Sequence, residues 1–200
     1  MSKDFFTAIE ERRSIYALSK EQVASDERIQ EIVEHAVKYV PSAFNSQSAR
    51  IIVLINDEHD KFWNLTTEAL KGVMGSDADF SSTQEKMNGF KSAYGTILFF
   101  EDEDTVRGLQ EAAPLYADNF PVWSDQSSGM HQFAIWTALE IEGFGASLQH
   151  YNPIVDEFVV REWNVPETWK LRAQMPFGKP MHQPGEKEFK PLEERVKIYK

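Results

Sequence analysis

The sequence has 200 residues, which is enough for one domain with a well-buried core and too few for two. Its formal net charge of −11 argues against nucleic-acid partners and anionic lipid surfaces, because a negative protein is repelled by both. The absence of cysteine excludes a disulfide framework, a thiolate metal site and a cysteine nucleophile, so redox chemistry would require a bound cofactor.

The apolar residues recur with the periods of helices and of buried strands. Helices are predicted over residues 4–13, 26–38, 58–71, 82–92, 104–117, 128–142 and 153–163. Strands are predicted over residues 51–55, 97–100, 147–149 and 170–177. The first two strands are continuously apolar, which is typical of strands covered on both faces. Many helices with few strands indicate an α+β or α/β fold.

Local signals refine these boundaries. The first helix is expected to end in the cations Arg12 and Arg13, and Asp26 is the candidate cap of the second helix. Residues 72–77 contain two glycines and are expected to form a mobile loop. The helix over 128–142 is apolar on nearly every side, which predicts either a central buried helix or a helix at an interface.

The composition of the chain changes after Gly178. Residues 179–195 combine prolines, glycine and many charges with only three apolar side chains to bury. Such a segment cannot fold alone and is expected to pack across a partner subunit. The first residues lack a signal-peptide pattern, and no apolar run approaches the roughly 20 residues of a membrane span, so we expect a cytoplasmic protein without a membrane segment.

The common catalytic and metal-binding motifs are missing from the sequence. Its five histidines include no pair four residues apart and no HExxH pattern, so a zinc hydrolase has little support and no metal ligand is assigned. The sequence also lacks GxSxG, a P-loop and a GxGxxG after a strand. Neither a serine nucleophile nor a Rossmann dinucleotide site is therefore indicated.

Three polar segments are candidates for a ligand site, and each also has a plain structural interpretation. Residues 12–14 offer two cations and a hydroxyl to a phosphate, or they form a solvated face paired with neighbouring glutamates. Residues 42–47 offer hydrogen-bonding groups to a polyol chain or a heteroaromatic edge, or they form an ordinary turn. Residues 143–151 allow close approach of a flat ligand, or they form a tight turn from helix to strand. The core, or the wall of a stacking pocket, would be formed by Tyr116, Phe120, Trp123, Phe133 and Trp136.

Taken in order along the chain, several segments resemble the nitroreductase family of flavoproteins. These segments are Glu11–Ser14, Pro41–Ser48, Gly143–Asn152, Met175–Pro180 and Lys190–Arg195. Each is a weak signal alone, but their shared order is hard to reach by coincidence. Within the family, the sequence is most similar to the short branch typified by the fungal fatty-acid-repression-mutant proteins and related bacterial nitroreductases.

The resemblance implies an α+β fold in which helices flank a central mixed, mainly antiparallel sheet. Residues 1–200 are expected to form a single domain, with an extended tail from about residue 179 that is exchanged with the partner of a homodimer. One FMN is expected in each of two sites at the dimer interface. Many family members have proline and an aromatic residue where this chain has Ser48-Ala49, so the pocket mouth and the choice of substrate stay open.

The resemblance also implies a basic site for the FMN phosphate. Arg12 and Arg13, with Ser14 beside them, correspond to the basic pair that lies on the phosphate and the flavin edge. A basic residue of the tail is expected to reach the same phosphate, and it corresponds to either Lys190 or Arg195. In a chain of net charge −11, such a site depends on local cations.

Two further segments are implied to contact the rest of the cofactor. The loop along the ribityl chain and the ring, supplied by the other subunit, corresponds to Ser42, Ala43, Asn45 and Gln47. The segment whose backbone lies near flavin N5 and the ring face corresponds to Leu148, Gln149 and His150.

The activity that the resemblance implies is that of an FMN-dependent oxidoreductase working by a ping-pong cycle. NADH or NADPH is the expected reductant, and nitroaromatic or quinone-like compounds are the expected acceptors. No catalytic side chain is assigned, because the flavin carries the chemistry. Two alternatives remain, namely a regulatory FMN-binding protein without a physiological turnover and an interaction protein that binds no flavin.

Overall fold

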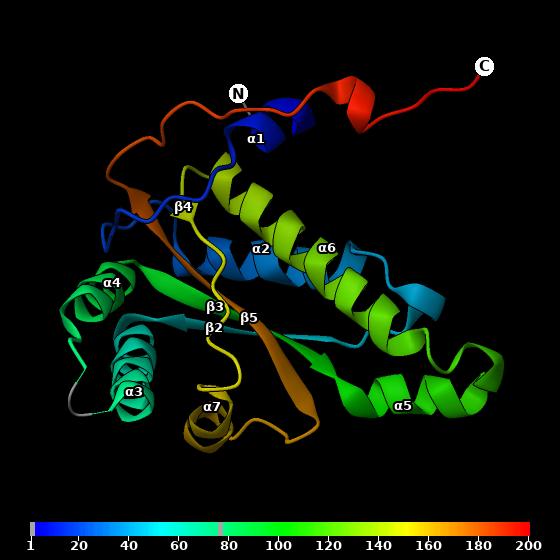
Figure 1. Cartoon of the computed structure of the whole chain (residues 1–200), viewed down its shortest axis with the longest axis horizontal. Coiled ribbons are helices and arrows are strands. Elements are labelled where there is room, and N and C mark those ends of the chain that lie inside the picture. The colour runs from blue at the N-terminus through cyan, green and yellow to red at the C-terminus, as the bar shows by residue number, and fades with distance from the viewer. Residues whose placement is uncertain (1–2, 76–77) are drawn as a thin grey trace.

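The central element of the fold is an antiparallel sheet in the order β1-β5-β3-β2, with β4 paired to β5 (Figure 1). The computed structural model describes residues 3–75 and 78–200. Its strands are β1 (Leu18–Ser19), β2 (Ala49–Ile55), β3 (Gly95–Asp102), β4 (Gly145–Ala146) and β5 (Trp169–Pro180). Its helices are α1 (Phe5–Glu11), α2 (Asp26–Tyr39), α3 (Asn56–Met74), α4 (Ser81–Lys91), α5 (Glu103–Ala112), α6 (Phe120–Ile141) and α7 (Asp156–Trp163). Short 3₁₀ turns occur at Ala43–Asn45, Pro114–Tyr116 and Leu192–Glu194. The expected α+β class is thereby confirmed.

Helices cover both faces of the sheet, and successive residues of β3 point to opposite layers. Ile97 and Phe99 pack in a core with α2 and α6, whereas Leu98 and Phe100 pack in a second core with α3, α4 and α7. Figure 1 shows α2 and α6 above the sheet and α3 and α7 below it. β3 is fully buried up to Glu101, as its continuously apolar sequence predicts.

Near the N-terminus, the structure corrects two boundaries. α1 ends at Glu11, and Arg12 caps it in an extended conformation, so the two arginines follow the helix instead of closing its last turn. The cap of α2 is Ser25 and not Asp26, because the Ser25 hydroxyl accepts a hydrogen bond from the amide of Arg28 at 3.2 Å.

Two helices end differently from their sequence patterns. α3 continues through Gly72 to Met74 and ends at Gly75, whose φ of 81° only glycine adopts readily, so the predicted loop over 72–77 is wrong for its first residues. The rest of that predicted loop, Ser76 and Asp77, lies outside the described residues. The helix predicted over 104–117 ends at Ala112, because Pro114 begins a separate 3₁₀ turn.

α6 is longer than predicted and begins at Phe120, with Pro121 in its first turn where a missing amide is tolerated. Its early turns bury serines as well as apolar residues. A helical period of apolar residues alone therefore does not predict these turns. Within one chain, Met130 and Phe133 remain 41% and 39% exposed, so an entirely buried helix is wrong. An interface helix, the other expectation, stays a prediction.

The segment after α6 also departs from the pattern. The strand predicted over 147–149 is instead β4 at 145–146, and Gln149 forms only a single bridge to Gln174 of β5. α7 begins at Asp156 instead of Pro153. The shift of the strand to β4 follows from its pairing with β5, which a local pattern does not contain.

Gly178 lies where β1, β5 and the residue before β3 meet. A Cβ at this position would stand 2.6 Å from the carbonyl oxygen of Ser19 and 2.8 Å from the amide nitrogen of Tyr94. We therefore expect Gly178→Ala to lower the free energy of unfolding by about 2 kcal/mol in a urea titration, because backbone atoms would have to move. Gly89→Ala in α4 is the control, since open space surrounds it, and it should stabilise by up to about 1 kcal/mol. Equal effects of the two changes would contradict this account.

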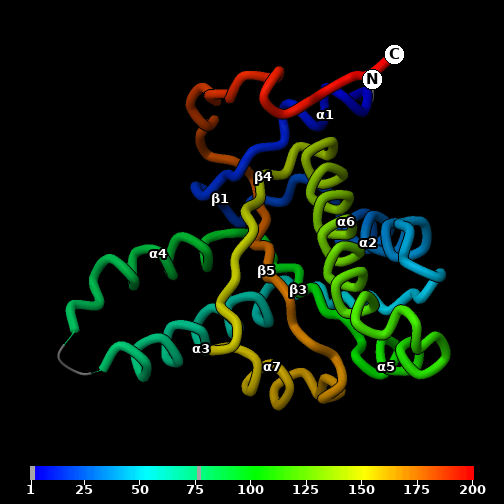
Figure 2. The backbone as a smooth tube through the Cα atoms, turned by 45° about the vertical axis from the view of Figure 1, so that its right-hand side comes forward, coloured from blue at the N-terminus to red at the C-terminus, as the bar shows by residue number. Residues whose placement is uncertain are grey.

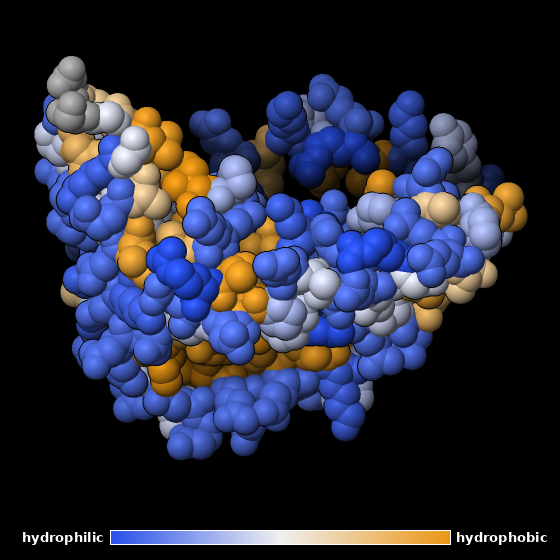
Figure 3. All heavy atoms as spheres, turned by 90° about the horizontal axis from the view of Figure 1, so that it is seen from below, coloured by the Kyte–Doolittle hydropathy of each residue, from blue (hydrophilic) through white to orange (hydrophobic). Residues whose placement is uncertain are grey.

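The tail leaves the sheet at the end of β5 and runs past α1 (Figure 2). All residues from 185 to 200 are exposed, including several large apolar ones. On the surface, hydrophobic atoms gather in patches between hydrophilic ones, and the molecule is hollowed between two projecting lobes (Figure 3).

Candidate active site

Arg12 is half-buried directly after α1, and its guanidinium lies 4.4 Å from the ring centroid of Trp136 on α6. Its Nε is buried and has no hydrogen-bond partner within the described chain. Burial, with a smaller contribution from Arg13, lowers the pKa of Arg12 from its usual range. A stacked cation with an unused donor is suited to an anionic ligand.

The interpretation of this arginine pair as part of a salt-bridged face does not hold in the structure. Glu11 pairs with Lys3 at 2.6 Å, and no ion pair of Arg12 or Arg13 occurs in the described ranges. Arg13 lines a cavity of about 450 Å³ together with Lys3, with Glu10, Glu11 and Glu140, and with Pro180, Gln183 and Pro184 of the tail. In this cavity the cations Lys3 and Arg13 face three glutamates, so Arg12 has the better environment for an anion.

Ser14 brings the arginines beside the segment that follows α6. It forms a parallel bridge with Ala146, and the amide of Ile15 donates to the carbonyl of Ala146 at 2.9 Å. After Ser147 come the three predicted site residues of this segment. Leu148 is half-buried, Gln149 is buried and His150 is exposed. Two of the three predicted site segments therefore adjoin within one chain.

The backbone of this second segment is held firmly against β5. Gln149 donates its amide to the carbonyl of Gln174 at 2.7 Å and accepts from the amide of Gln174 at 2.9 Å. The Gln149 side chain donates to the Ser147 hydroxyl at 3.0 Å, so it is engaged within the protein. The side-chain carbonyl of Gln174 accepts from the amide of Tyr151 at 2.8 Å. The backbone of this segment is therefore held rigidly by its hydrogen bonds to the buried Gln174.

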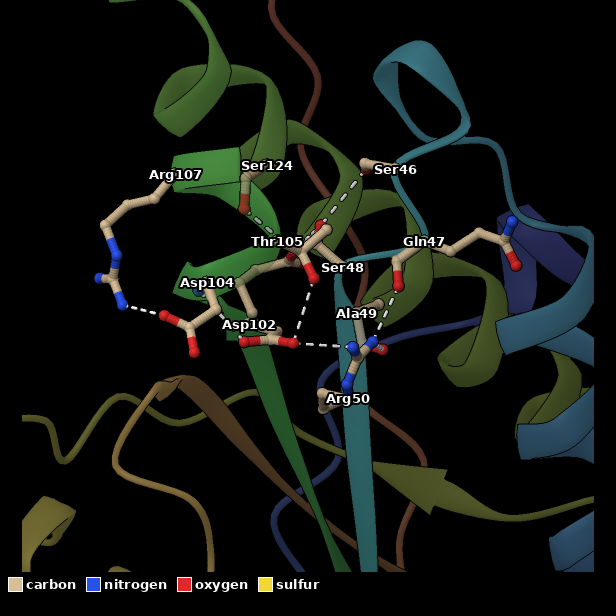
Figure 4. A network of polar contacts seen from close by, with 11 residues as sticks. Ser46, Gln47, Ser48, Ala49, Arg50, Asp102, Asp104, Thr105, Arg107 and Ser124 are labelled. Carbon is tan, nitrogen blue, oxygen red and sulfur yellow. Dashed lines mark hydrogen bonds and ion pairs between the residues drawn. The ribbon is translucent and has the colours of Figure 1, made fainter. Parts of the chain in front are cut away.

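The polar loop at residues 42–47 has an unusual backbone. Phe44, Asn45 and Gln47 have φ values of 55°, 51° and 49°, in the left-handed region where non-glycine residues are uncommon. The Ser42 hydroxyl accepts from the amide of Gln47 at 3.0 Å and closes the loop. The side chain of Gln47 points away from the polar network beneath it (Figure 4), and that of Asn45 is also exposed. The loop thus presents polar groups outward.

The third segment does not join the first two within one chain. The Ser127 hydroxyl of α6 donates to the carbonyl of Pro41 at 3.3 Å, whereas Arg12 lies on Trp136 of the same helix. These positions are separated by about 14 Å along the helix axis. Ala43 is half-buried at the 42–47 loop, and Lys190 and Arg195 are exposed on the tail. Within one chain, the predicted residues thus fall into two groups, and a site that combines them across two subunits stays a prediction.

Sequence reasoning missed two features of this region. Trp136 was assigned only to the core or a stacking wall, yet it is the platform on which Arg12 stacks. Glu101, fully buried at the end of β3, was not singled out. A signal for it existed, because it is the acidic residue directly after four apolar strand residues.

The profile of the nitroreductase family matches residues 9–179 of the chain. The chain belongs to the nitroreductase family. CinD from Lactococcus lactis, a nitroreductase of this family, is 46% identical with a TM-score of 0.92, and the match covers 98% of this chain and 100% of that one. Two Saccharomyces cerevisiae proteins also match, HBN1 at 36% identity over 89% of each chain and the nitroreductase FRM2 at 34% over 93% of each.

The nitroreductase fold and the likeness to the fatty-acid-repression-mutant branch are thus confirmed, and the protein is an oxidoreductase of this family. CinD has been solved in complex with nicotinic acid, chloramphenicol and 4-nitrophenol, all small aromatic compounds. Among the described helices, none is long and apolar enough to cross a bilayer.

Proposed function

We propose that this nitroreductase-family protein is an FMN-dependent NAD(P)H oxidoreductase that reduces nitroaromatic or quinone-like acceptors. The observation that carries the proposal is the guanidinium of Arg12, which is stacked on Trp136 and whose buried Nε has no hydrogen-bond partner within residues 3–75 and 78–200. The bridge from Ser14 to Ala146 connects it to the segment that contains Leu148–His150. A desolvated cation with an unused donor is suited to binding a phosphate group. FMN carries such a group, whereas riboflavin does not.

Each residue group has a distinct task in this proposal. Arg12, Arg13 and Ser14 bind the phosphate, with Lys190 or Arg195 of a tail as an additional cation, and Trp136 holds the Arg12 guanidinium in a fixed plane. The strip Leu148, Gln149 and His150 supports the ring through its rigid backbone. Ser42, Ala43, Asn45 and Gln47, called the cofactor loop below, line the ribityl chain from the other subunit.

When bound, FMN would accept a hydride from the reduced nicotinamide at its own N5 atom and pass the electrons on to the acceptor. The protein orients the reactants and excludes water, and no side chain has to act as acid or nucleophile. The CinD complexes support the two ligand classes. Nicotinic acid shares its ring with the nicotinamide of NAD(P)H, and chloramphenicol and 4-nitrophenol are nitroaromatics. A reductant from the NAD(P)H pool accords with the cytoplasmic location expected from the sequence.

The subunit arrangement is part of the same proposal. The exposed tail carries Val196, Ile198 and Tyr199 between the cations Arg195, Lys197 and Lys200. On the body of the protein, a groove of about 420 Å³ between α2 and β2 is lined by five Ile and Val side chains and rimmed by Asp26, Glu27 and Glu34. β2 ends the sheet order, so its outer edge is free to accept a strand. The apolar tail residues match the apolar lining of the groove, and the tail cations match its acidic rim. In the proposed homodimer, the partner's tail therefore binds in this groove.

The test is an anaerobic absorption spectrum of the purified protein, before and after NADH and then NADPH are added. We expect the absorption bands of oxidised FMN, bleached within seconds by at least one reductant and restored by 4-nitrophenol. Bound FMN that neither nucleotide reduces would favour a regulatory flavoprotein. A colourless protein that takes up no added FMN would favour an interaction protein.

A further inference from the structure

The carboxyl group of Glu101 is fully buried, and its two oxygens differ in their hydrogen bonding. Its Oε2 accepts hydrogen bonds from the hydroxyls of Ser48 at 2.5 Å and of Ser124 at 2.9 Å. Its Oε1 is buried and has no partner in the described part of the chain. A buried polar atom without a partner costs stability, so the position of this carboxyl calls for a reason beyond packing.

The charges that face Glu101 come from two other elements. Arg172 of β5 favours the charged carboxylate, and Asp125 of α6 disfavours it. These two side chains also pair with each other at 3.1 Å, and both remain partly exposed. Burial is the largest influence and raises the pKa of Glu101 above its ordinary value, against the opposing effect of the two serine hydroxyls.

Ser48 connects Glu101 to the end of the cofactor loop. It follows Gln47 directly and is almost completely buried. Its hydroxyl donates to Glu101, and its carbonyl accepts from the amide of Asp102 at 2.9 Å. Ser48 is thus fixed to the end of β3 by both side chain and backbone. Figure 4 shows Ser48 close to Asp102 and Ser124 within this polar network.

Arg50 forms a second connection beside the first. Its guanidinium donates to the carbonyl of Gln47 at 2.8 Å and to the carboxylate of Asp102 at 2.8 Å. Asp102 directly follows Glu101. These two acids at the end of β3 therefore hold Gln47, through Arg50, and Ser48 directly. Asn45 and Gln47 keep backbone conformations that persist only when their surroundings enforce them, and these contacts supply the support.

We propose that Glu101 is a positioning residue for the cofactor loop, which it holds through Ser48 in the conformation that binds FMN. The proposal rests on the proposed function, because it assigns a role toward the cofactor named there. Glu101 is fully buried and acts on the loop through the Ser48 hydroxyl. Its carboxylate acts by accepting the Ser48 hydroxyl, and the unpartnered Oε1 makes that acceptance sensitive to protonation.

The two serines that share the carboxylate provide a matched pair of variants. Ser48→Ala removes the bond to the loop, and Ser124→Ala removes the bond to α6 from the same oxygen. FMN is titrated into each flavin-free protein, and quenching of flavin fluorescence gives the dissociation constant. We expect about tenfold weaker binding for S48A, about fivefold weaker for E101Q, and a change below about twofold for S124A. Urea unfolding of each flavin-free variant shows that all are folded.

Two further readouts separate positioning from simple stability. The double variant S48A/E101Q should bind FMN no more weakly than S48A, because both changes break one connection. The affinities of the wild type and E101Q should differ most at high pH and converge as pH falls, since protonated Glu101 is neutral like glutamine. FMN's own phosphate titrates equally in both proteins, so this comparison cancels it.

The outcomes distinguish the positioning role from the proposed function. If the wild type binds no FMN, the proposed function fails and the positioning role with it. If the wild type binds FMN and S48A binds it equally well, or S124A weakens binding as much as S48A, only the positioning role is overturned.

Discussion

Replacing Arg12 with alanine is expected to weaken FMN binding by about a hundredfold, because a charge-assisted hydrogen bond to a phosphate contributes about 1.5–3 kcal/mol. The change also leaves the face of Trp136 without the cation that lies 4.4 Å from it. The measurement is a titration of the flavin-free protein with FMN and, in parallel, with riboflavin, which lacks the phosphate. The loss should be large for FMN and small for riboflavin.

Two arginine variants control this experiment. Arg12→Lys keeps the charge but not the planar guanidinium, so it should recover part of the affinity. Arg161→Ala removes an exposed arginine of α7 that pairs with Glu162, and FMN affinity should not change. The same titration of Arg13→Ala decides whether both members of the pair bind the phosphate. An Arg12→Ala protein with wild-type FMN affinity would remove Arg12 from the site.

In the proposed homodimer, deleting residues 196–200 should produce monomers at micromolar concentration and reduce the proposed FMN content. The deletion removes the exposed apolar side chains Val196, Ile198 and Tyr199. Two exchanged tails bury six such side chains, so a contribution of about 1.5 kcal/mol each sums to about 9 kcal/mol, and the dissociation constant of the dimer should rise by about a millionfold. Sedimentation equilibrium measures the mass, and the absorption spectrum measures the flavin content.

A matched pair of point variants locates the surface that the tail occupies. Val53→Lys puts a cation into the groove between α2 and β2 and should weaken the dimer in the same way as the deletion. Leu115→Asp changes a side chain that is 84% exposed on another part of the surface, and it should leave the dimer intact. A deletion variant that remains dimeric would contradict the exchanged tail, and a dimeric Val53→Lys protein would move the tail to another surface.

The accuracy of the sequence prediction followed the range of the interactions that form each element. The strands over 51–55 and 97–100 and helix α2 were predicted within a few residues, because their patterns reflect local conformation and burial. β1 at Leu18–Ser19 was missed, since two residues have no period and exist as a strand only by pairing with β5. β4 was displaced for the same reason, because its partner lies about 30 residues away along the chain.

The site shows the same division. The order of the polar segments along the chain was sufficient to identify the nitroreductase family, since motif order belongs to the sequence. The sequence left open whether Arg12 and Arg13 were paired with glutamates, and that question turned on the competing pairing of Glu11 with Lys3. The structure also gives the two arginines different surroundings, because Arg12 stacks on Trp136 and Arg13 lines a neighbouring cavity.

By itself, then, the sequence determined the family and the fold class, and its lack of cysteine predicted that redox chemistry would depend on a bound cofactor. The tertiary structure alone decided that the buried Arg12 Nε keeps an unused donor over Trp136, which loop backbone is held in the left-handed region, and which carboxyl is buried beneath that loop. The physical reason is distance along the chain. Ser48 and Glu101, or Arg12 and Trp136, meet only after the sheet has formed, and no local pattern records the hydrogen bonds and stacking that result.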